Sequence, residues 1–319
     1  MTTDLAVQAE GLEFVYGERR ALAGVGFTVA RGAAHGFLGP NGSGKSTLFR
    51  LLSTLVPLQQ GRVEMLGLDL RSDAAAIRRR IGVVFQSPAV DKKLKVGENL
   101  RYAGALLGLA GTELRDRIAA VLEATRLADR ERDLVDELSG GLRRRVEIAK
   151  CLLGRPEIVL LDEASTGLDP VARTEMWDVL REQEGLTVLF TTHIMDEAVG
   201  ANRITLLDEG RIVAEGSPAE LVREVGGQVL EIESDDVEAM RRALPPEIAA
   251  GATVVEGVLR LEGAKVHELV PALMQQQGDR IQRLQLAHPS LNDVFLHKTG
   301  KRFEVREPEA QGKKKRRRR

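Results

Sequence analysis

The chain has 319 residues, of which 43% are hydrophobic and 29% are charged, a composition typical of a folded globular protein with room for one large domain and a smaller one. Its single cysteine, Cys151, excludes an internal disulfide, and no apolar run is long enough to span a bilayer. The net charge of −1 conceals an asymmetry, because residues 313–319 are all basic and leave 39 of the 46 basic residues to face 47 acidic ones.

The first diagnostic segment is a glycine-rich loop between a strand predicted at residues 34–38 and a helix predicted from Ser46. It matches the phosphate-binding pattern G-x-x-x-x-G-K-[ST]. Glycines let the backbone approach a polyphosphate, and a helix N-terminus favours its charge. We expect Lys45 to reach the β- and γ-phosphates and Ser46 to hold Mg²⁺. The expected nucleotide-binding residues of the loop are Gly39, Pro40, Asn41, Gly42, Ser43, Gly44, Lys45, Ser46 and Thr47.

Two further motifs follow. Residues 136–143 contain Leu-Ser-Gly-Gly and lead into an amphipathic helix predicted at 143–153; by itself this motif is also consistent with a turn and a helix cap. Residues 158–163 form a predicted buried strand that ends in Asp162 and Glu163. Such carboxylates can hold Mg²⁺ and polarise a water for attack on the γ-phosphate, although an ordinary strand end also carries solvated acids. Together with the loop, they predict a nucleotide-hydrolysing site.

With Leu-Ser-Gly-Gly between them, these two motifs resemble the ATP-binding cassette family of P-loop ATPases. Other family positions appear in order: Tyr16 resembles the aromatic residue that stacks on adenine, Gln86 the Q-loop glutamine, Asp169 the end of the D-loop, and His193 the switch histidine. Two residues depart from the family pattern. Leu142 stands where glutamine is usual, and Ala164 replaces the proline after the acidic pair.

The resemblance implies an α/β P-loop nucleotide-binding domain over residues 5–221, with a helical subdomain near 96–137. It implies Glu163 and His193 as catalytic residues and an Mg²⁺ shell from Ser46, Gln86 and Asp162. In the family, the Leu-Ser-Gly-Gly residues contact the γ-phosphate held by the opposite subunit, so we expect a head-to-tail homodimer with two Mg-ATP molecules between its subunits. The residues expected to reach across are Ser139, Gly140 and Gly141, and Asp169 is a further expected nucleotide-binding residue.

Beyond the cassette, the pattern indicates a small α+β domain over residues 228–300. The order of its predicted elements is β-α-β-β-α-β, which is the ferredoxin-like order, followed by a helix capped by Ser290. The segment from Pro289 to His297 resembles the C-terminal region of daunorubicin-resistance-type exporters. The predicted strands lie at 228–233, 253–256, 258–262 and 280–286, and the predicted helices at 235–244 and 264–277.

The exporter resemblance implies an ATPase that drives efflux of a drug-like or lipid-like substrate through a separate integral membrane permease, from the cytoplasmic face of the membrane. Another cargo, such as a glycan or an ion, stays open, as does a soluble cassette ATPase that acts on nucleic acid or ribosomes. We do not expect nucleic acid, because the ribosome-acting branch usually carries two cassettes in one chain. Residues 301–319 are expected to be a disordered basic tail. This tail has either no role, as a solvated end, or a binding role, for which contact with anionic lipid is favoured over nucleic acid.

Overall fold

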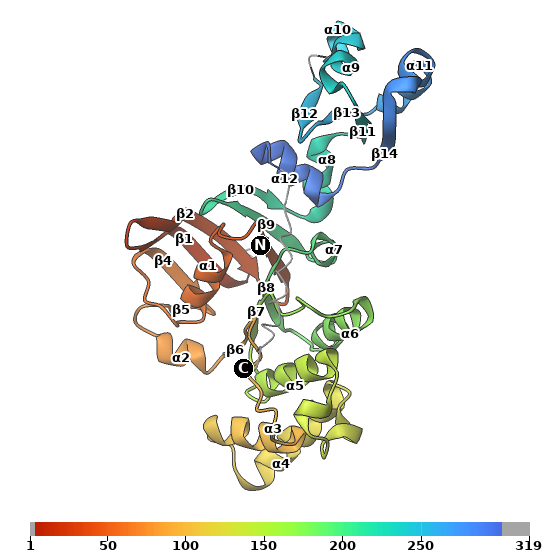
Figure 1. Ribbon diagram of the computed structural model, residues 1–319. Helices are drawn as coiled ribbons and strands as arrows, with labels where there is room; N and C mark the ends of the chain where they lie inside the picture. The colour runs from red at the N-terminus through yellow and green to blue at the C-terminus, as the bar shows by residue number, and fades with distance from the viewer. Residues whose placement is uncertain (1–3, 250, 302–319) are drawn as a thin grey trace, which may run out of the picture.

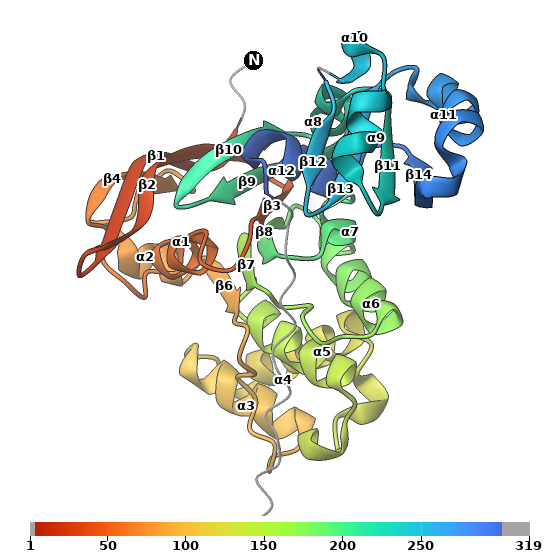
Figure 2. The same ribbon diagram turned by 45° about the horizontal axis from the view of Figure 1, so that its top comes forward.

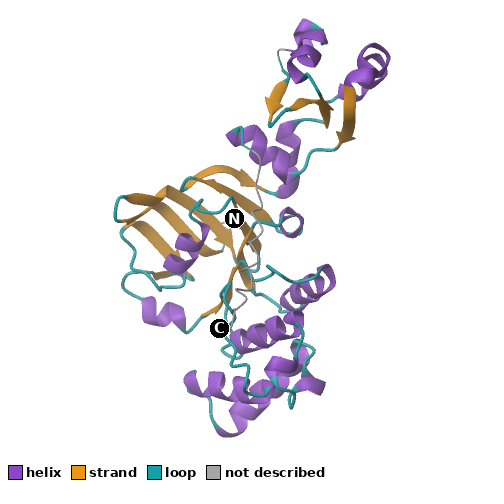
Figure 3. Ribbon diagram, viewed as in Figure 1, coloured by secondary structure: helices purple, strands orange, loops and turns teal. Residues whose placement is uncertain are grey.

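The computed structural model describes residues 4–249 and 251–301, and the basic residues 313–319, with the expectations placed on them, lie outside this part. The strands of the described part form three sheets (Figure 1). Helices flank the strands on several sides, and Figure 3 shows them beside the sheets as well as at the two ends of the view. No helix within the described ranges combines the length and the apolar character needed to cross a bilayer.

The central sheet positions the functional motifs. Its strand order is β10-β9-β3-β8-β7-β6, and all neighbours are parallel except the β9–β10 hairpin. The strand predicted at residues 34–38 is β3, and the strand before the acidic pair is the fully buried β7. Because parallel strands end at one edge, the segments after β3, β7 and β8 meet there. The bounds are β3 Ala34–Leu38, β6 Ile81–Val84, β7 Ile158–Asp162, β8 Thr187–Thr192, β9 Arg203–Asp208 and β10 Arg211–Gly216.

Strands from the N-terminal part of the chain form a second, antiparallel sheet that was not predicted from the sequence. Its order is β2-β1-β4-β5. Its apolar face packs with α1 (Lys45–Leu52) into one core that includes Phe14, Phe27, Phe37 and Phe49. The bounds of its strands are β1 Leu5–Tyr16, β2 Arg19–Ala30, β4 Gln60–Met65 and β5 Leu68–Asp69, and the short helix α2 (Ala74–Arg78) leads into β6.

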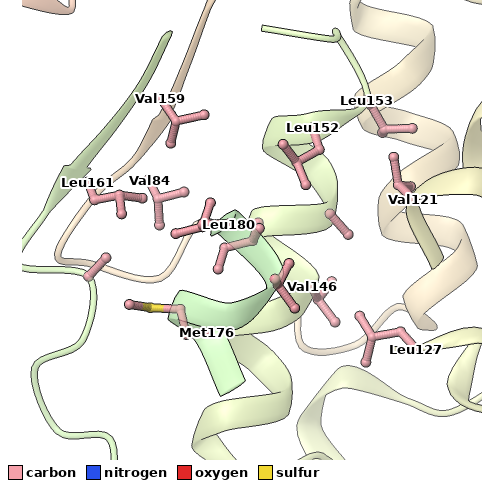
Figure 4. Packing of buried hydrophobic residues seen from close by; sticks show 14 of the residues in the cluster. Val84, Val121, Leu127, Val146, Leu152, Leu153, Val159, Leu161, Met176 and Leu180 are labelled. Atoms are coloured by element: carbon pink, nitrogen blue, oxygen red, sulfur yellow. The ribbon is translucent and has the colours of Figure 1, made fainter. Parts of the chain in front are cut away.

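A helical region lies on the other side of the central sheet (Figure 2). Its helix α5 (Gly140–Leu152) starts three residues before the predicted start, because Ser139 caps it. Figure 4 shows Val146 of α5 among apolar side chains that include Val84 of β6 and Leu180 of α6. The other elements here are α3 Val96–Leu106, α4 Gly111–Ala124, α6 Pro170–Arg181, α7 Met195–Ala198 and the 3-10 turns Ala128–Arg130 and Val135–Glu137.

The C-terminal sheet has the order β12-β13-β11-β14, and its neighbouring strands are antiparallel. The first and third strands in sequence are therefore central, which confirms the ferredoxin-like prediction. The strands are β11 Gln228–Ser234, β12 Thr253–Val255, β13 Val258–Gly263 and β14 Ile281–Ala287, and the helices are α9 Val237–Ala243, α10 Pro246–Ala249 and α11 Val270–Gln277.

Two helices connect this sheet to the cassette. Helix α8 (Pro218–Val225) begins at a Ser217 capping box, and α12 (Leu291–Thr299) begins at a Ser290 capping box, the latter at the predicted start. Leu221 of α8 and Phe295 of α12 share one buried cluster with Ile204 and Leu206 of β9. Two 3-10 turns, Val266–Leu269 and Gly278–Arg280, flank α11.

Candidate active site

The glycine-rich loop joins β3 to α1, and close backbone contacts fix its path. Gly44 precedes α1 with a φ of 108°, in the left-handed region that favours glycine. A Cβ added to Gly44 would lie 2.5 Å from the carbonyl oxygen of Ala21, and one added to Gly39 would lie 2.2 Å from that of Leu207. The loop is therefore packed between β2 and β9, and it leads directly into the N-terminus of α1.

Two buried polar side chains lie inside the loop. Lys45 is 3% exposed, and its Nζ donates to the carbonyl oxygens of Gly39 at 2.7 Å and of Pro40 at 3.1 Å. Burial lowers the pKa of Lys45, while the nearby carboxylates of Glu163 and Asp162 act in the opposite direction. Ser43 is also buried, and its Oγ has no hydrogen-bond partner among the residues that the structure describes. Both groups suit a polyanion that offers acceptor oxygens.

The acidic pair at the end of β7 is held by the neighbouring strand β8. The hydroxyl of Thr191 donates to Asp162 Oδ1 at 2.7 Å and accepts from the backbone N–H of Glu163 at 2.9 Å. Glu163 has a φ of 46°, a left-handed conformation that costs a residue with a Cβ about 1–2 kcal/mol. Strain of this kind is often found at functional positions.

Two predicted site residues lie next to the carboxylate of Glu163. Gln86 Nε2 donates to Glu163 Oε2 at 3.1 Å, and His193 Nδ1 lies 3.6 Å from the same oxygen. Glu163 is itself 8% exposed. Segments that are far apart in the sequence thus converge on one carboxylate oxygen.

A hollow of about 130 Å³ lies beside this cluster. Larger cavities exist, among them one of about 370 Å³ between α6 and α7 and one of about 620 Å³ that residues 40–43 line together with Asp208, Glu209 and Lys301. The smaller hollow differs from them because Lys45, Ser46 and Glu163 line it. Tyr16 lines it and is 42% exposed, as an aromatic ring that stacks on a base would be. The lining residues are Tyr16, Arg19, Ala21, Asn41, Gly42, Gly44, Lys45, Ser46, Thr47 and Glu163.

Other predicted residues do not line this hollow. Ser139 caps α5, with its Oγ accepting from the N–H of Leu142 at 3.2 Å, and Asp169 caps α6 through the N–H of Ala172 at 2.9 Å. Ser139 and Gly140 are exposed. A Cβ on Gly141 would lie 2.6 Å from Cβ of Ala172, so the first turns of α5 and α6 are in close contact.

The sequence analysis missed several residues that shape the site. Arg19 lines the hollow and donates to the carbonyl of Gly42 at 3.4 Å, and Thr191 organises the acidic pair. In the sequence, these residues were marked only by the basic pair at 19–20 and by the two threonines at the end of β8. Arg144 and Glu147 of α5 are also buried against the segment that carries Gln86.

Comparisons with known proteins agree with this geometry. A family model described as ABC transporter matches residues 22–166, which include the glycine-rich loop, Gln86, Leu-Ser-Gly-Gly and the acidic pair. The daunorubicin resistance ATP-binding protein DrrA3 of Streptomyces coeruleorubidus is 40% identical over 95% of this chain and 99% of its own length. The Nod factor export ATP-binding protein I of Ralstonia nicotianae is 36% identical over 92% of this chain and 94% of its own length.

Solved structures match the same architecture. The ADP conformation of MJ1267, an ATP-binding cassette of an ABC transporter, aligns with a TM-score of 0.64 and 27% identity, and covers 70% of this chain and 95% of that one. The cbiO1 protein of Clostridium perfringens, part of the ABC transporter complex cbiONQ, aligns with a TM-score of 0.65 and 27% identity, over 77% of this chain and 98% of that one.

Proposed function

The chain belongs to the ATP-binding cassette family, in the branch of the daunorubicin resistance ATP-binding proteins, and on that premise we propose that it drives an exporter by hydrolysing Mg-ATP. Membership of the family makes it a nucleotide-binding ATPase subunit of a transporter. The main support for a hydrolytic mechanism is that Glu163 lies next to both Gln86 and His193, beside the glycine-rich loop.

The first part of the proposed chemistry is binding. The loop amides and Lys45 bind the β- and γ-phosphates, and the ring of Tyr16 stacks on the adenine. Ser46, Asp162 and Gln86 would hold Mg²⁺, which would supply positive charge to stabilise the charge that develops on the phosphates. The unpartnered Oγ of Ser43 and the neutral carbonyl partners of Lys45 support an anion at this place.

The second part is hydrolysis. Glu163 orients the attacking water and accepts its proton, a role whose removal lowers a rate by roughly 10²–10⁴-fold. His193, 3.6 Å from that carboxylate, holds Glu163 and contacts the γ-phosphate. The hydrogen bond between Asp162 and Thr191 keeps the metal ligand fixed at the end of β7.

The active form is a homodimer in this proposal. Ser139 and Gly140 are exposed at the start of α5 and do not line the hollow beside the glycine-rich loop of the same chain. They are therefore free to contact the nucleotide of a second copy. Asp169 caps α6, which is in contact with α5 at Gly141. It would therefore move together with the surface that carries Ser139. ATP binding then favours the closed dimer and hydrolysis the open one, a population shift driven by the ligand.

A membrane-spanning permease on a separate chain would receive this motion. A groove of about 280 Å³ between the strand β6 and α3 is lined mostly by apolar residues, which include Val84 and Phe85, together with Glu147 and Lys150. Leu106 in the same groove is 90% exposed, and nearby Tyr102 is 64% exposed, which suits an apolar partner segment. The segment 86–98, which begins at Gln86, lies between the active site and this groove. It would pass the conformational change to the permease at the cytoplasmic face of the membrane.

The proposed cargo is drug-like or lipid-like. The support comes from the names of relatives, which describe daunorubicin resistance and Nod factor export, in proteins that align with more than nine tenths of this chain. The chemistry of cargo selection belongs to the permease.

The experiment that tests the proposal is purification of the tagged chain from membranes, followed by identification of what comes with it and measurement of ATP hydrolysis. We expect an integral membrane protein whose presence raises the ATPase rate, and no stimulation when the chain carries Glu163→Gln. Recovery of ribosomes or nucleic acid without a membrane protein would replace the exporter with a soluble ATPase.

A further inference from the structure

Helix α5 carries the signature residue Ser139 at its start and a buried ion pair one turn later. Arg144 and Glu147 are each 6% exposed, and Arg144 Nη1 lies 2.6 Å from Glu147 Oε2. The two residues are three positions apart and therefore lie on one face of the helix. That face looks onto the segment that follows β6 and contains Gln86.

The pair holds this segment by its backbone. Arg144 donates to the carbonyl oxygens of Phe85 at 2.9 Å and of Gln86 at 3.4 Å. Glu147 accepts from the N–H of Ala89, and Lys150, one turn further along α5, donates to the carbonyl of the same residue. Both ends of the segment 85–89 are thus bound to three side chains of one helix.

Stability alone does not account for this pair. Burial raises the pKa of Glu147 and lowers the pKa of Arg144, in each case against the attraction of the partner. A buried pair of this kind is often no more stable than apolar residues of similar volume. A fixed geometry for the segment 85–89 is what the pair does provide.

The geometry matters because Gln86 is bound at two places. Its backbone carbonyl accepts from Arg144, and its side-chain amide donates to Glu163 Oε2 at 3.1 Å. A continuous path therefore runs from α5 through Arg144 and Gln86 to the carboxylate of Glu163. A shift of α5 moves the carbonyl of Gln86, and the amide on the same residue moves with it.

We propose that Arg144 and Glu147 are positioning residues that hold Gln86 against Glu163, and so tie the hydrolytic carboxylate to the helix that presents Ser139 to the second copy. This inference rests on the proposed function, because it assigns its effect to the step in which Glu163 acts. When Ser139 engages the partner's nucleotide, α5 is fixed, and the Gln86 amide is fixed with it.

The test is a kinetic comparison of Arg144→Gln and Glu147→Gln with a control on the adjacent residue, Arg145→Gln. Arg145 also forms an ion pair from α5, but its partner is Glu175 of α6, at 3.3 Å. We expect kcat for ATP hydrolysis to fall about tenfold in the first two variants, the size of coupling found within one hydrogen-bond network, while KM stays within about twofold. The control keeps both constants within about twofold.

A double variant and a conservative variant distinguish a positioning role from a simple loss of structure. In a Gln86→Ala background, Arg144→Gln removes nothing further, so the expected double-variant kcat equals that of Gln86→Ala alone. Arg144→Lys, which keeps a cation and a donor, restores part of the rate. Binding of a fluorescent ATP analogue shows that each variant is folded, and Arg144→Lys and Glu147→Gln carry the test if Arg144→Gln does not fold.

Equal losses in Arg145→Gln, or losses that multiply in the Gln86→Ala background, would overturn the inference, as would a normal kcat in folded Arg144→Gln. The Glu163→Gln variant separates this inference from the proposed function. Its inactivity together with a normal Arg144→Gln removes only the positioning role, whereas its full activity removes the proposed hydrolytic role of Glu163.

Discussion

The backbone N–H of Gly210 donates to the carbonyl oxygen of Ser43 at 3.0 Å, and this bond joins the turn between β9 and β10 to the glycine-rich loop. The carbonyl of Gly210 accepts from Ala23 of β2 at 2.9 Å, so the turn is bound on both sides. Gly210 has a φ of 76°, and an added Cβ would lie 2.8 Å from the carbonyl oxygen of Ala21. The nucleotide loop therefore depends on a glycine about 170 positions away in the sequence.

The first prediction is that Gly210→Ala weakens ATP binding about tenfold, because β2 or the turn must move and the loop moves with it. Gly185→Ala is the matched control. Gly185 has a similar φ of 71°, but no atom of the described residues lies within 4 Å of the place an added Cβ would take, so this variant carries only the conformational cost of about 1 kcal/mol. Titration with a fluorescent ATP analogue compares the two, and equal affinities would contradict the role of the turn.

A second prediction concerns Lys301, which follows α12. Its Nζ lies 2.8 Å from Glu209 Oε1 and 3.4 Å from Asp208 Oδ2, in the same turn. Lys301→Ala leaves two carboxylates unneutralised beside the loop, and we expect KM for ATP to rise about twofold to threefold at low ionic strength and less in high salt.

The control for Lys301 is Lys298→Ala on the same helix. Lys298 pairs with Glu224 of α8 at 2.6 Å and does not touch the turn, so its removal leaves KM unchanged. A change of KM that is equal in both variants, or independent of salt, would exclude this electrostatic effect.

Tyr16 gives a prediction about the base. Stacking of a base on an aromatic ring is worth about 1–3 kcal/mol, so Tyr16→Ala is expected to weaken ATP binding about tenfold or more. Tyr16→Phe keeps the ring and the affinity. Isothermal titration with ATP measures both, and unchanged binding by the alanine variant would place the adenine elsewhere.

The buried side chain of His35 leads to a prediction of how the stability of the fold depends on pH. It is 1% exposed, its Nε2 lies 2.8 Å from Thr205 Oγ1, and burial, with a smaller effect of Arg203, lowers its pKa from 6.5 to about 4. Between those values the unfolded chain binds a proton that the folded chain does not. The free energy of unfolding therefore falls as pH drops from 6.5 to 4, by about 3 kcal/mol from this residue.

Urea unfolding at pH 7.5 and pH 4.5 tests this for the wild type and for His35→Leu. The variant cannot take up that proton, so its stability should fall less between the two values. An equal fall in both proteins would show that His35 does not contribute to the acid sensitivity.

The motifs made much of the site predictable, because each has a characteristic local conformation. A glycine-rich loop that ends in Lys45 and Ser46 specifies a strand, a turn and a helix, and Ser290 with Asp293 marks the start of α12. The alternation in residues 228–286 was enough for the ferredoxin-like order, since each element there has its own period.

The missed features depend on partners that are distant in the sequence. The N-terminal sheet requires β1 to pair with β4, and the hydroxyl of Thr191 reaches Asp162 only because β7 and β8 lie in a particular register. Arg144 and Glu147 look like ordinary exposed charges of an amphipathic helix until the segment 85–89 is seen to cover them. No local pattern specifies contacts of this type.

The role of Glu163 is tested by the rate of ATP hydrolysis by Glu163→Gln, measured in a single turnover with the binding of ATP and the mass of the complex followed in parallel. We expect a rate at least about 100-fold below that of the wild type, retained ATP binding, and a dimer that accumulates in the presence of Mg-ATP. A wild-type rate in the variant would mean that the carboxylate beside Gln86 and His193 is not the group that activates the water.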